Sequence, residues 1–61
     1  MTAREAEKNI LIDGWYYSYS NGSHRYYYHP VKPGKVTIPF HSGKDLSKRV
    51  VDSIKKQAGL K

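Results

Sequence analysis

The chain has no cysteine and no long apolar run, and each absence excludes a class of protein. Without cysteine, neither disulfide bonds nor a thiolate zinc site can hold its 61 residues together. No segment approaches the roughly 18 consecutive apolar residues of a membrane span. The N-terminus also lacks the charged-then-apolar pattern of a secretory signal. We therefore expect a cytoplasmic protein without a membrane segment.

Clustered metal ligands and phosphate-binding loops are also missing. The five Asp and Glu residues are dispersed, whereas metal-dependent phosphate chemistry normally uses grouped carboxylates. The three histidines do not have the spacing of a zinc site, and the glycines do not form a phosphate-binding loop. We therefore expect neither a metal nor another cofactor.

Length and charge are the next constraints. Residues 1–61 are expected to form one domain near the lower size limit for independent folding, so a partner protein is one way to add stability. The net charge is +6. Residues 1–14 carry two basic and three acidic side chains, whereas residues 15–61 carry nine and two. This one-sided excess predicts a polyanionic partner for the later part of the chain, although a solvated basic surface is the alternative.

Amphipathic helices are predicted at both ends of the chain. Thr2 and Glu5 have the spacing of a capping box, and apolar residues at helical spacing follow over residues 3–12. Ser47 is a candidate N-cap for a second helix, which Gly59 ends in a Schellman motif. The buried stripe of this second helix is expected to consist of Val50, Val51, Ile54 and Ala58.

Between the helices the apolar residues recur with a period of two, as in β-strands. Aromatic residues alternate from Trp15 onward, and Asn21–Gly22 is typical of a two-residue type I′ hairpin. Two prolines and Gly34 predict a second reversal before a strand over residues 35–40. The sequence thus predicts an α+β fold of order α-β-β-β-α, with a three-stranded antiparallel sheet and both helices on one face.

These turns also predict the register of the sheet. A hairpin at Asn21–Gly22 pairs Tyr19 with His24. A loop centred on Lys32 then pairs His24 with Phe40. Both registers place His24 on the helix-covered face, together with Trp15, Tyr17, Tyr19, Tyr26, Tyr28, Val36, Ile38 and Phe40. The open face is expected to carry Tyr16, Ser18, Arg25, Tyr27, His29, Lys35 and Thr37.

His24 is the candidate catalytic residue. An imidazole titrates close to physiological pH, so it can accept and return a proton as cleavage of RNA by its own 2′-hydroxyl requires. Arg25, Lys44 and His41 are nearby groups that could stabilise the charge of the phosphorane. The alternative is a partly buried structural role for His24. We interpret His29 as a turn residue.

Exposed aromatic and basic side chains are the candidate RNA contacts. Tyr16 and Tyr27 on the predicted open face could stack on bases, or they could dock a partner protein. Tyrosines of the helix-covered face are expected to pack in the core. The candidate RNA-binding residues are Ser23, Arg25, Tyr27, Lys35, His41, Lys44 and Lys48.

Several short motifs follow one another between Gly14 and Leu60. They are Gly22-Ser23-His24, His29-Pro30, Val36-Thr37-Ile38-Pro39, His41, Gly43-Lys44 and Ile54-Lys55-Lys56-Gln57-Ala58-Gly59-Leu60. In this combination the chain resembles the HicA family of toxin mRNA interferases. Many members carry a basic stretch just before the Gly-Ser-His motif, whereas this chain has Tyr19-Ser20-Asn21.

The resemblance implies a double-stranded-RNA-binding-domain-like fold and a metal-independent endoribonuclease that cleaves mRNA and arrests translation, with His24 as its catalytic residue. It also implies a HicB antitoxin that covers the active site. Together with the toxin, this antitoxin represses their operon, which means that the toxin meets operator DNA only through the complex. A non-catalytic RNA-binding module of the same fold is the alternative function. A protein-binding adaptor without RNA affinity is a third.

Overall fold

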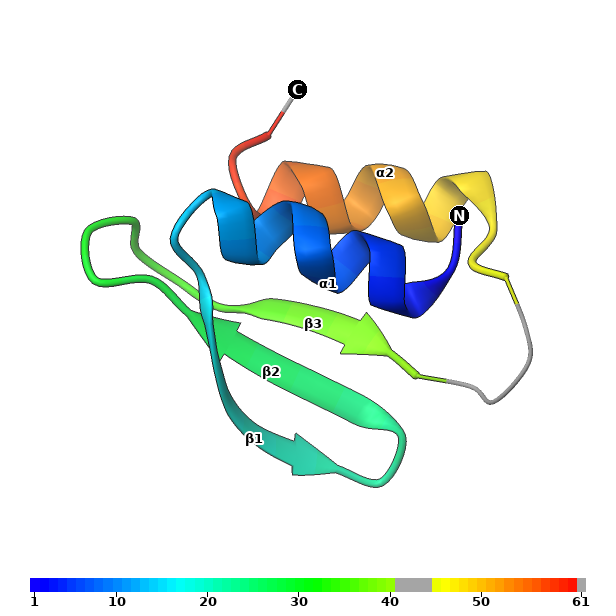
Figure 1. Ribbon diagram of the computed structural model, residues 1–61, viewed down its shortest axis with the longest axis horizontal. Helices are drawn as coiled ribbons and strands as arrows, with labels where there is room; N and C mark the ends of the chain where they lie inside the picture. The colour runs from blue at the N-terminus through cyan, green and yellow to red at the C-terminus, as the bar shows by residue number, and fades with distance from the viewer. Residues whose placement is uncertain (41–44, 61) are drawn as a thin grey trace.

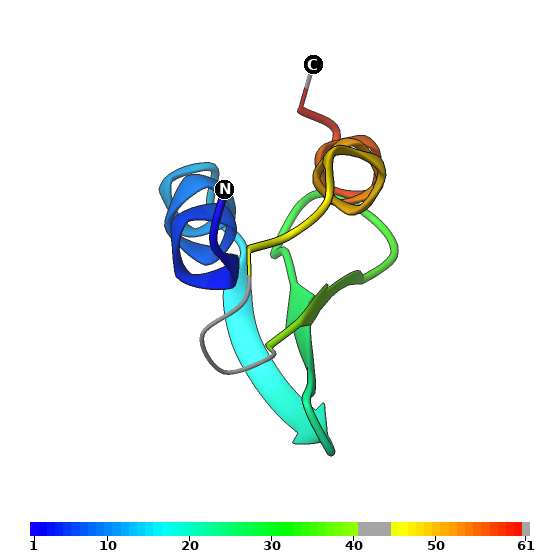
Figure 2. The ribbon, with the colours of Figure 1, turned by 90° about the vertical axis from the view of Figure 1, so that its right-hand side faces the viewer.

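Two helices and a three-stranded antiparallel sheet make up the fold of this computed structural model, which describes residues 1–40 and 45–60. Helix α1 spans Ala3–Ile12 and helix α2 spans Lys48–Gln57. Strands β1, β2 and β3 span, in this order, Tyr16–Asn21, His24–Tyr28 and Val36–Pro39. The strand order is β1-β2-β3, and Figure 1 and Figure 2 show both helices on the same side of the sheet. The predicted α+β fold is confirmed, and its α-β-β-β-α order is that of double-stranded-RNA-binding domains.

Helix α1 begins with the predicted capping box. The Thr2 hydroxyl accepts a hydrogen bond from the Glu5 backbone N–H at 3.2 Å, and the Glu5 carboxylate accepts one from the Thr2 N–H at 2.9 Å. The Thr2 N–H, and then the Thr2 hydroxyl at 3.1 Å, donate to the Glu5 carboxylate and favour its ionised form, so they lower the pKa of Glu5. The short helix is thereby fixed at the end where its backbone donors would otherwise lack partners.

Helix α2 also has the predicted caps. The Ser47 hydroxyl accepts from the Val50 N–H at 3.3 Å. At the other end Gly59 has a φ of 73°, and the Leu60 N–H donates to the Lys55 carbonyl at 2.7 Å, as in a Schellman motif. Neither of the described helices is long and apolar enough to cross a membrane.

The core lies between the helices and the sheet. Its largest side chains are those of Trp15, at the end of the α1–β1 connection, and Tyr27 in β2, which are 2% and 0% exposed. The other buried residues come from both helices and from β3, and they are Ala3, Ala6, Ile10, Val36, Ile38, Ile54 and Ala58. The predicted stripe of α2 is confirmed at Ile54 and Ala58, whereas Val50 and Val51 are only half-buried.

The β1–β2 register differs from the predicted one. Asn21 pairs with His24, so the loop consists of Gly22 and Ser23 instead of Asn21 and Gly22. Gly22, the first loop residue, has a φ of 63°, whereas the φ of Ser23, the second, is not positive. Positive φ at the first position alone is typical of a type II′ turn. A bulge at Ser18 then shifts the register further along the hairpin.

The β2–β3 register is displaced by one residue from the predicted one. Tyr27 pairs with Val36 and His24 with Pro39. Because side chains alternate along a strand, this slip exchanges the two faces of β2. The predicted faces were therefore wrong for five residues of this strand: Arg25 and Tyr27 lie on the helix-covered face, and His24, Tyr26 and Tyr28 lie on the open face.

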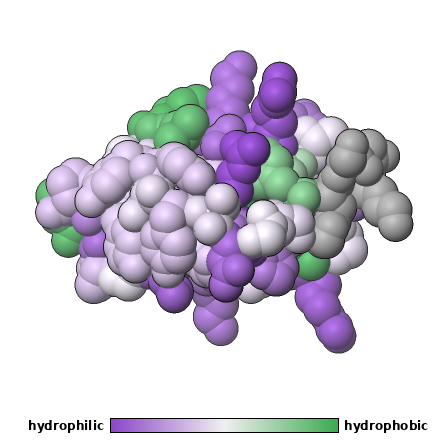
Figure 3. Space-filling view, turned by 90° about the horizontal axis from the view of Figure 1, so that it is seen from below, coloured by the Kyte–Doolittle hydropathy of each residue, from purple (hydrophilic) through white to green (hydrophobic). Residues whose placement is uncertain are grey.

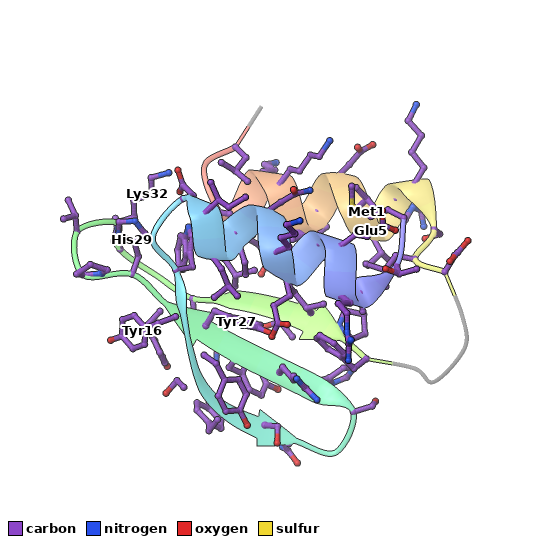
Figure 4. All side chains as sticks on the ribbon, in the orientation of Figure 1. Met1, Glu5, Tyr16, Tyr27, His29 and Lys32 are labelled. Atoms are coloured by element: carbon purple, nitrogen blue, oxygen red, sulfur yellow. The ribbon has the colours of Figure 1, made fainter. Side chains whose placement is uncertain are left out.

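Tyr27 is the residue of β2 that this register buries most deeply. Its ring fills the space between the sheet and α1, and its hydroxyl donates a hydrogen bond to the Glu7 carboxylate at 2.5 Å. Figure 4 shows the Tyr27 side chain on the side of β2 that faces the helices. A tyrosine can be buried at this depth because its hydroxyl has a partner there.

Strand β1 is exposed along its whole length. The helices lie against β3, and the β1–β2 hairpin extends beyond them (Figure 1). The predicted packing of Tyr17 and Tyr19 in the core is therefore wrong, since their exposed fractions are 48% and 44%. The bulge at Ser18 also puts these two tyrosines on opposite faces, with Tyr17 beside Tyr27 and Tyr19 beside Tyr26.

Candidate functional site

His24 is the first residue of β2, and its side chain is exposed on the open face. Its backbone is held on both sides, since it pairs with Asn21 in β1 and with Pro39 in β3. The Phe40 N–H also donates a hydrogen bond to the Ser23 carbonyl at 2.6 Å. Within residues 1–40 and 45–60, the His24 ring forms no hydrogen bond. In this part of the chain, neither ring nitrogen of His24 is occupied by a protein group.

Tyrosines surround His24 on the open face. The rings of Tyr19 and Tyr26 stack with their centres 4.7 Å apart and their planes 26° from parallel. The next pair along the hairpin is Tyr16 and Tyr28. We call Tyr16, Tyr19, Tyr26 and Tyr28 the open-face tyrosines. Figure 3, the view from below the sheet, shows a broad area of intermediate hydropathy bordered by hydrophilic side chains.

Lys35 is the described cation nearest to this aromatic surface. Its ammonium lies 4.8 Å from the centre of the Tyr26 ring, within the range of a cation–π interaction. Lys35 is exposed and on the open face, as the sequence predicted. The same face thus carries a histidine, stacked aromatic rings and a positive charge.

Arg25 is separated from His24 although the two are neighbours in sequence. Its guanidinium lies 4.1 Å from the centre of the Phe40 ring and 3.8 Å from the Glu7 carboxylate, on the helix-covered side. Side chains of adjacent strand residues point to opposite faces, so the Arg25 guanidinium and the His24 ring lie on different sides of the sheet. The expected role of Arg25 beside His24 is therefore not supported by this geometry.

Tyr27 is likewise removed from the candidate RNA contacts. Burial, and then the hydrogen bond to the Glu7 carboxylate, raises the pKa of the Tyr27 phenol far above its usual value. Its fully buried ring cannot stack on a base. The expectation that Tyr27 lies on the open face was wrong, whereas the same expectation for Tyr16 is confirmed.

The remaining candidate residues are spread over the molecule. Ser23 is an exposed turn residue beside His24. Lys48 is exposed at the start of α2, in the helix layer. His41 and Lys44 lie outside the described residues. In the described part of the chain, no group of three or more His, Asp or Glu side chains could hold a metal ion.

His29 has a different environment from His24. Its Nδ1 accepts hydrogen bonds from the backbone N–H groups of Val31 and Lys32, both at 3.0 Å, so Nε2 carries the proton and donates to the Asp13 carbonyl at 2.9 Å. Its ring also packs edge-on against Trp15. Figure 4 shows His29 and Lys32 beside the end of α1. His29 thus has a structural role at the start of the β2–β3 loop, which agrees with its interpretation as a turn residue. Its predicted place on the open face is wrong, because its ring lies against Asp13 and the buried Trp15.

Asp13 completes this structural cluster. Its carboxylate accepts hydrogen bonds from the Lys32 ammonium at 2.5 Å and from the Trp15 indole at 3.2 Å. The hydrogen bond from Lys32 is the main reason that the pKa of Asp13 is lowered. Lys32 also donates to the Ala58 carbonyl at 3.1 Å, which joins the ends of both helices to the β2–β3 loop.

The sequence of nearly the whole chain matches a known protein family. Residues 3–60 match the family described as the HicA toxin of bacterial toxin–antitoxin systems. The chain belongs to the HicA toxin family. The match extends over α1, which the motifs from Gly14 to Leu60 did not cover. No curated protein matches the chain.

Membership of the HicA family establishes a role as a toxin and implies an antitoxin partner. The motif histidine of this member stands on an open sheet face rich in tyrosine. Sequence reasoning missed Tyr19, Tyr26 and Tyr28 as candidates for the site, because it placed them in the core. The run of three tyrosines indicates only that both faces of the strand carry tyrosine, and the register decides which of them lie on the open face.

Proposed function

We propose that the chain is a metal-independent endoribonuclease that cleaves mRNA and thereby inhibits translation. The observation that carries this proposal is the contrast between the two described histidines. Both ring nitrogens of His29 form hydrogen bonds with the protein, whereas the exposed His24 ring has no such partner among the described residues. A residue that transfers protons to a substrate needs this availability.

In the proposed reaction, His24 accepts the proton of an RNA 2′-hydroxyl. The 2′-oxygen then forms a bond to the adjacent phosphorus, and the bond from phosphorus to the 5′-oxygen of the next nucleotide breaks. The imidazolium gives this proton to the leaving 5′-oxygen, directly or through a water molecule, so the imidazole is restored. The products are a 2′,3′-cyclic phosphate and a 5′-hydroxyl end. Because the RNA supplies the nucleophile, a single proton-transferring side chain with nearby cations is sufficient.

Lys35 is the described cation that we assign to the RNA backbone near this site. Ser23 beside His24, together with His41 and Lys44 from the following segment, completes the proposed contacts, while Lys48 is proposed to bind phosphate farther away. We also propose that residues 1–61 act as one domain and that a HicB antitoxin neutralises the toxin by covering His24. Operator DNA is then contacted only through that complex. The mRNA substrate places this activity in the cytoplasm.

The first prediction concerns His24→Ala and His24→Gln. Cleavage of a 5′-labelled RNA in EDTA should fall by about 10²- to 10⁴-fold in both variants, the usual contribution of a general acid–base residue. RNA binding should change little, and thermal unfolding should match the wild type. If the wild-type protein binds RNA but does not cleave it, and the variants bind equally well, the chain is a non-catalytic RNA-binding module.

A further inference from the structure

Three side chains from adjacent parts of the sheet form a row across the open face. The Lys35 ammonium lies over the Tyr26 ring at 4.8 Å, and the Tyr26 ring stacks on the Tyr19 ring at 4.7 Å. Lys35 immediately precedes β3, Tyr26 is in β2 and Tyr19 is in β1, so the row follows the strand order. We call Lys35, Tyr26 and Tyr19 the tyrosine ladder.

Tyr19 is the last member of the tyrosine ladder. Its ring packs on Tyr26, and its strand, β1, is the edge strand of the sheet, so no described strand lies beyond Tyr19. The side chain is 44% exposed and the whole strand is outside the helix layer. A flat aromatic ring from another molecule can therefore extend the row by stacking on Tyr19.

The chemistry of the open face favours a nucleic acid as that molecule. None of the five acidic residues lies in a strand: they occur in α1, at its C-cap, and in or just before α2. The aliphatic residues Val36 and Ile38 point to the helices, so the open face consists of tyrosines with polar, basic and proline side chains. An apolar protein partner would find little aliphatic surface here. A polyanion with flat rings would find both stacking partners and Lys35.

The tyrosine ladder also lies close to His24. His24 and Tyr26 share a face of β2 and are two residues apart, which corresponds to roughly 7 Å along the strand. A base stacked on the ladder would therefore bring the backbone of a neighbouring nucleotide toward the imidazole. Bases within a duplex are already stacked and paired, so only unpaired nucleotides can bind in this way.

We propose that the tyrosine ladder, with Tyr19 at its open end, is a base-stacking subsite for unpaired nucleotides of the RNA that is cut at His24. This inference rests on the proposed ribonuclease function and adds a substrate class to it. The substrate is a single-stranded segment bound on the open face of the sheet, with Lys35 positioned to contact a phosphate. Tyr19 acts here as a binding and positioning residue.

The test compares Tyr19 with Tyr17, a matched residue in the same strand. Tyr17 has a similar exposed fraction, 48%, but lies on the helix-covered face. In the His24→Ala background, which prevents cleavage, fluorescence anisotropy measures binding to a labelled single-stranded RNA and to the same sequence in a duplex. Tyr19→Ala should weaken binding of the single strand by about 5- to 150-fold, the usual effect of removing one stacking partner. Tyr19→Phe and Tyr17→Ala should bind like the parent.

The outcomes separate this inference from the proposed function. Tyr19→Leu retains side-chain volume without an aromatic face, and its binding should fall as in Tyr19→Ala while thermal unfolding stays at the parent value. If Tyr19→Ala and Tyr17→Ala bind RNA equally, or if the duplex binds as well as the single strand, the subsite is overturned even though wild-type cleavage continues. If Tyr19→Ala retains RNA affinity but loses its antitoxin, the face is a protein-docking surface instead. If the wild type neither binds nor cleaves RNA, the ribonuclease function itself is wrong.

Discussion

The two faces of the sheet use the same residue type for opposite purposes. On the helix-covered face, Tyr27 is fully buried and its hydroxyl is bound by Glu7. On the open face, Tyr26, the preceding residue, stacks on Tyr19 under the Lys35 ammonium. The difference follows from strand alternation alone, because consecutive side chains point to opposite sides. One tyrosine is therefore part of the buried core, while its neighbour is part of the open face.

The same contrast separates the histidines. His29 joins the β2–β3 loop to Asp13 and Trp15, and its ring is enclosed by these contacts. The His24 backbone pairs with a neighbouring strand on each side, whereas its side chain forms no hydrogen bond with the described residues. A small domain cannot spare many side chains from its core, so residues without a structural role stand out as candidates for function.

The largest expected effect in stability comes from comparing Tyr27→Ala with Tyr26→Ala. Loss of the buried Tyr27 ring should cost about 3–5 kcal/mol of unfolding free energy, as for other large-to-small core changes. Tyr26→Ala should cost less, about 1–2 kcal/mol, because it removes the stacking of a half-buried ring on Tyr19 and its contact with Lys35. Urea denaturation followed by circular dichroism measures both. Equal losses would mean that the faces of β2 are not distinguished as described.

The sequence predicted the ends of both helices and the α-β-β-β-α order, because caps such as Thr2 and Ser47 are local signals that depend on a few neighbouring residues. It did not predict the faces of β2. Three consecutive tyrosines have no apolar alternation, so the register depended on the exact positions of the two turns.

Neither turn position could be obtained from local preferences. Asn21–Gly22 favours a type I′ hairpin, yet the loop is Gly22–Ser23. The observed register lets Tyr27 bond to Glu7, 20 residues away in the sequence, and no local pattern contains this contact. The sequence named His24 as the candidate residue and placed Lys35 and Tyr16 on the open face, as the structure has them. The placement of His24, Tyr19 and Tyr26 on that face required the three-dimensional structure.

The histidine comparison can be tested by stability as well. His29→Ala leaves the backbone N–H groups of Val31 and Lys32 and the carbonyl of Asp13 without their partner, and it removes an edge contact to Trp15. We expect a loss of about 1–3 kcal/mol in unfolding free energy. His24→Ala should stay within about 0.5 kcal/mol of the wild type, as surface changes usually do. Chemical denaturation at pH 7 measures both variants, and a larger loss for His24→Ala would contradict the division of roles.

The smallest expected effect concerns the buried face. It is the change that the Tyr27 phenol causes in the unfolding free energy at alkaline pH. Its pKa is raised by burial and by the hydrogen bond to Glu7, so the folded state retains the phenol proton that the unfolded state releases above about pH 10. The stabilisation is fully present below that pH and is lost as pH rises toward the folded-state pKa, by about 1.4 kcal/mol per pH unit. Tyr27→Phe has no phenol to ionise, so its unfolding free energy should fall less between pH 9 and pH 11. Tyr26→Phe is the matched control, and it should lose as much stability as the wild type over this range. If the unfolding free energies of Tyr27→Phe and Tyr26→Phe depend on pH in the same way, the fold does not raise the pKa of Tyr27.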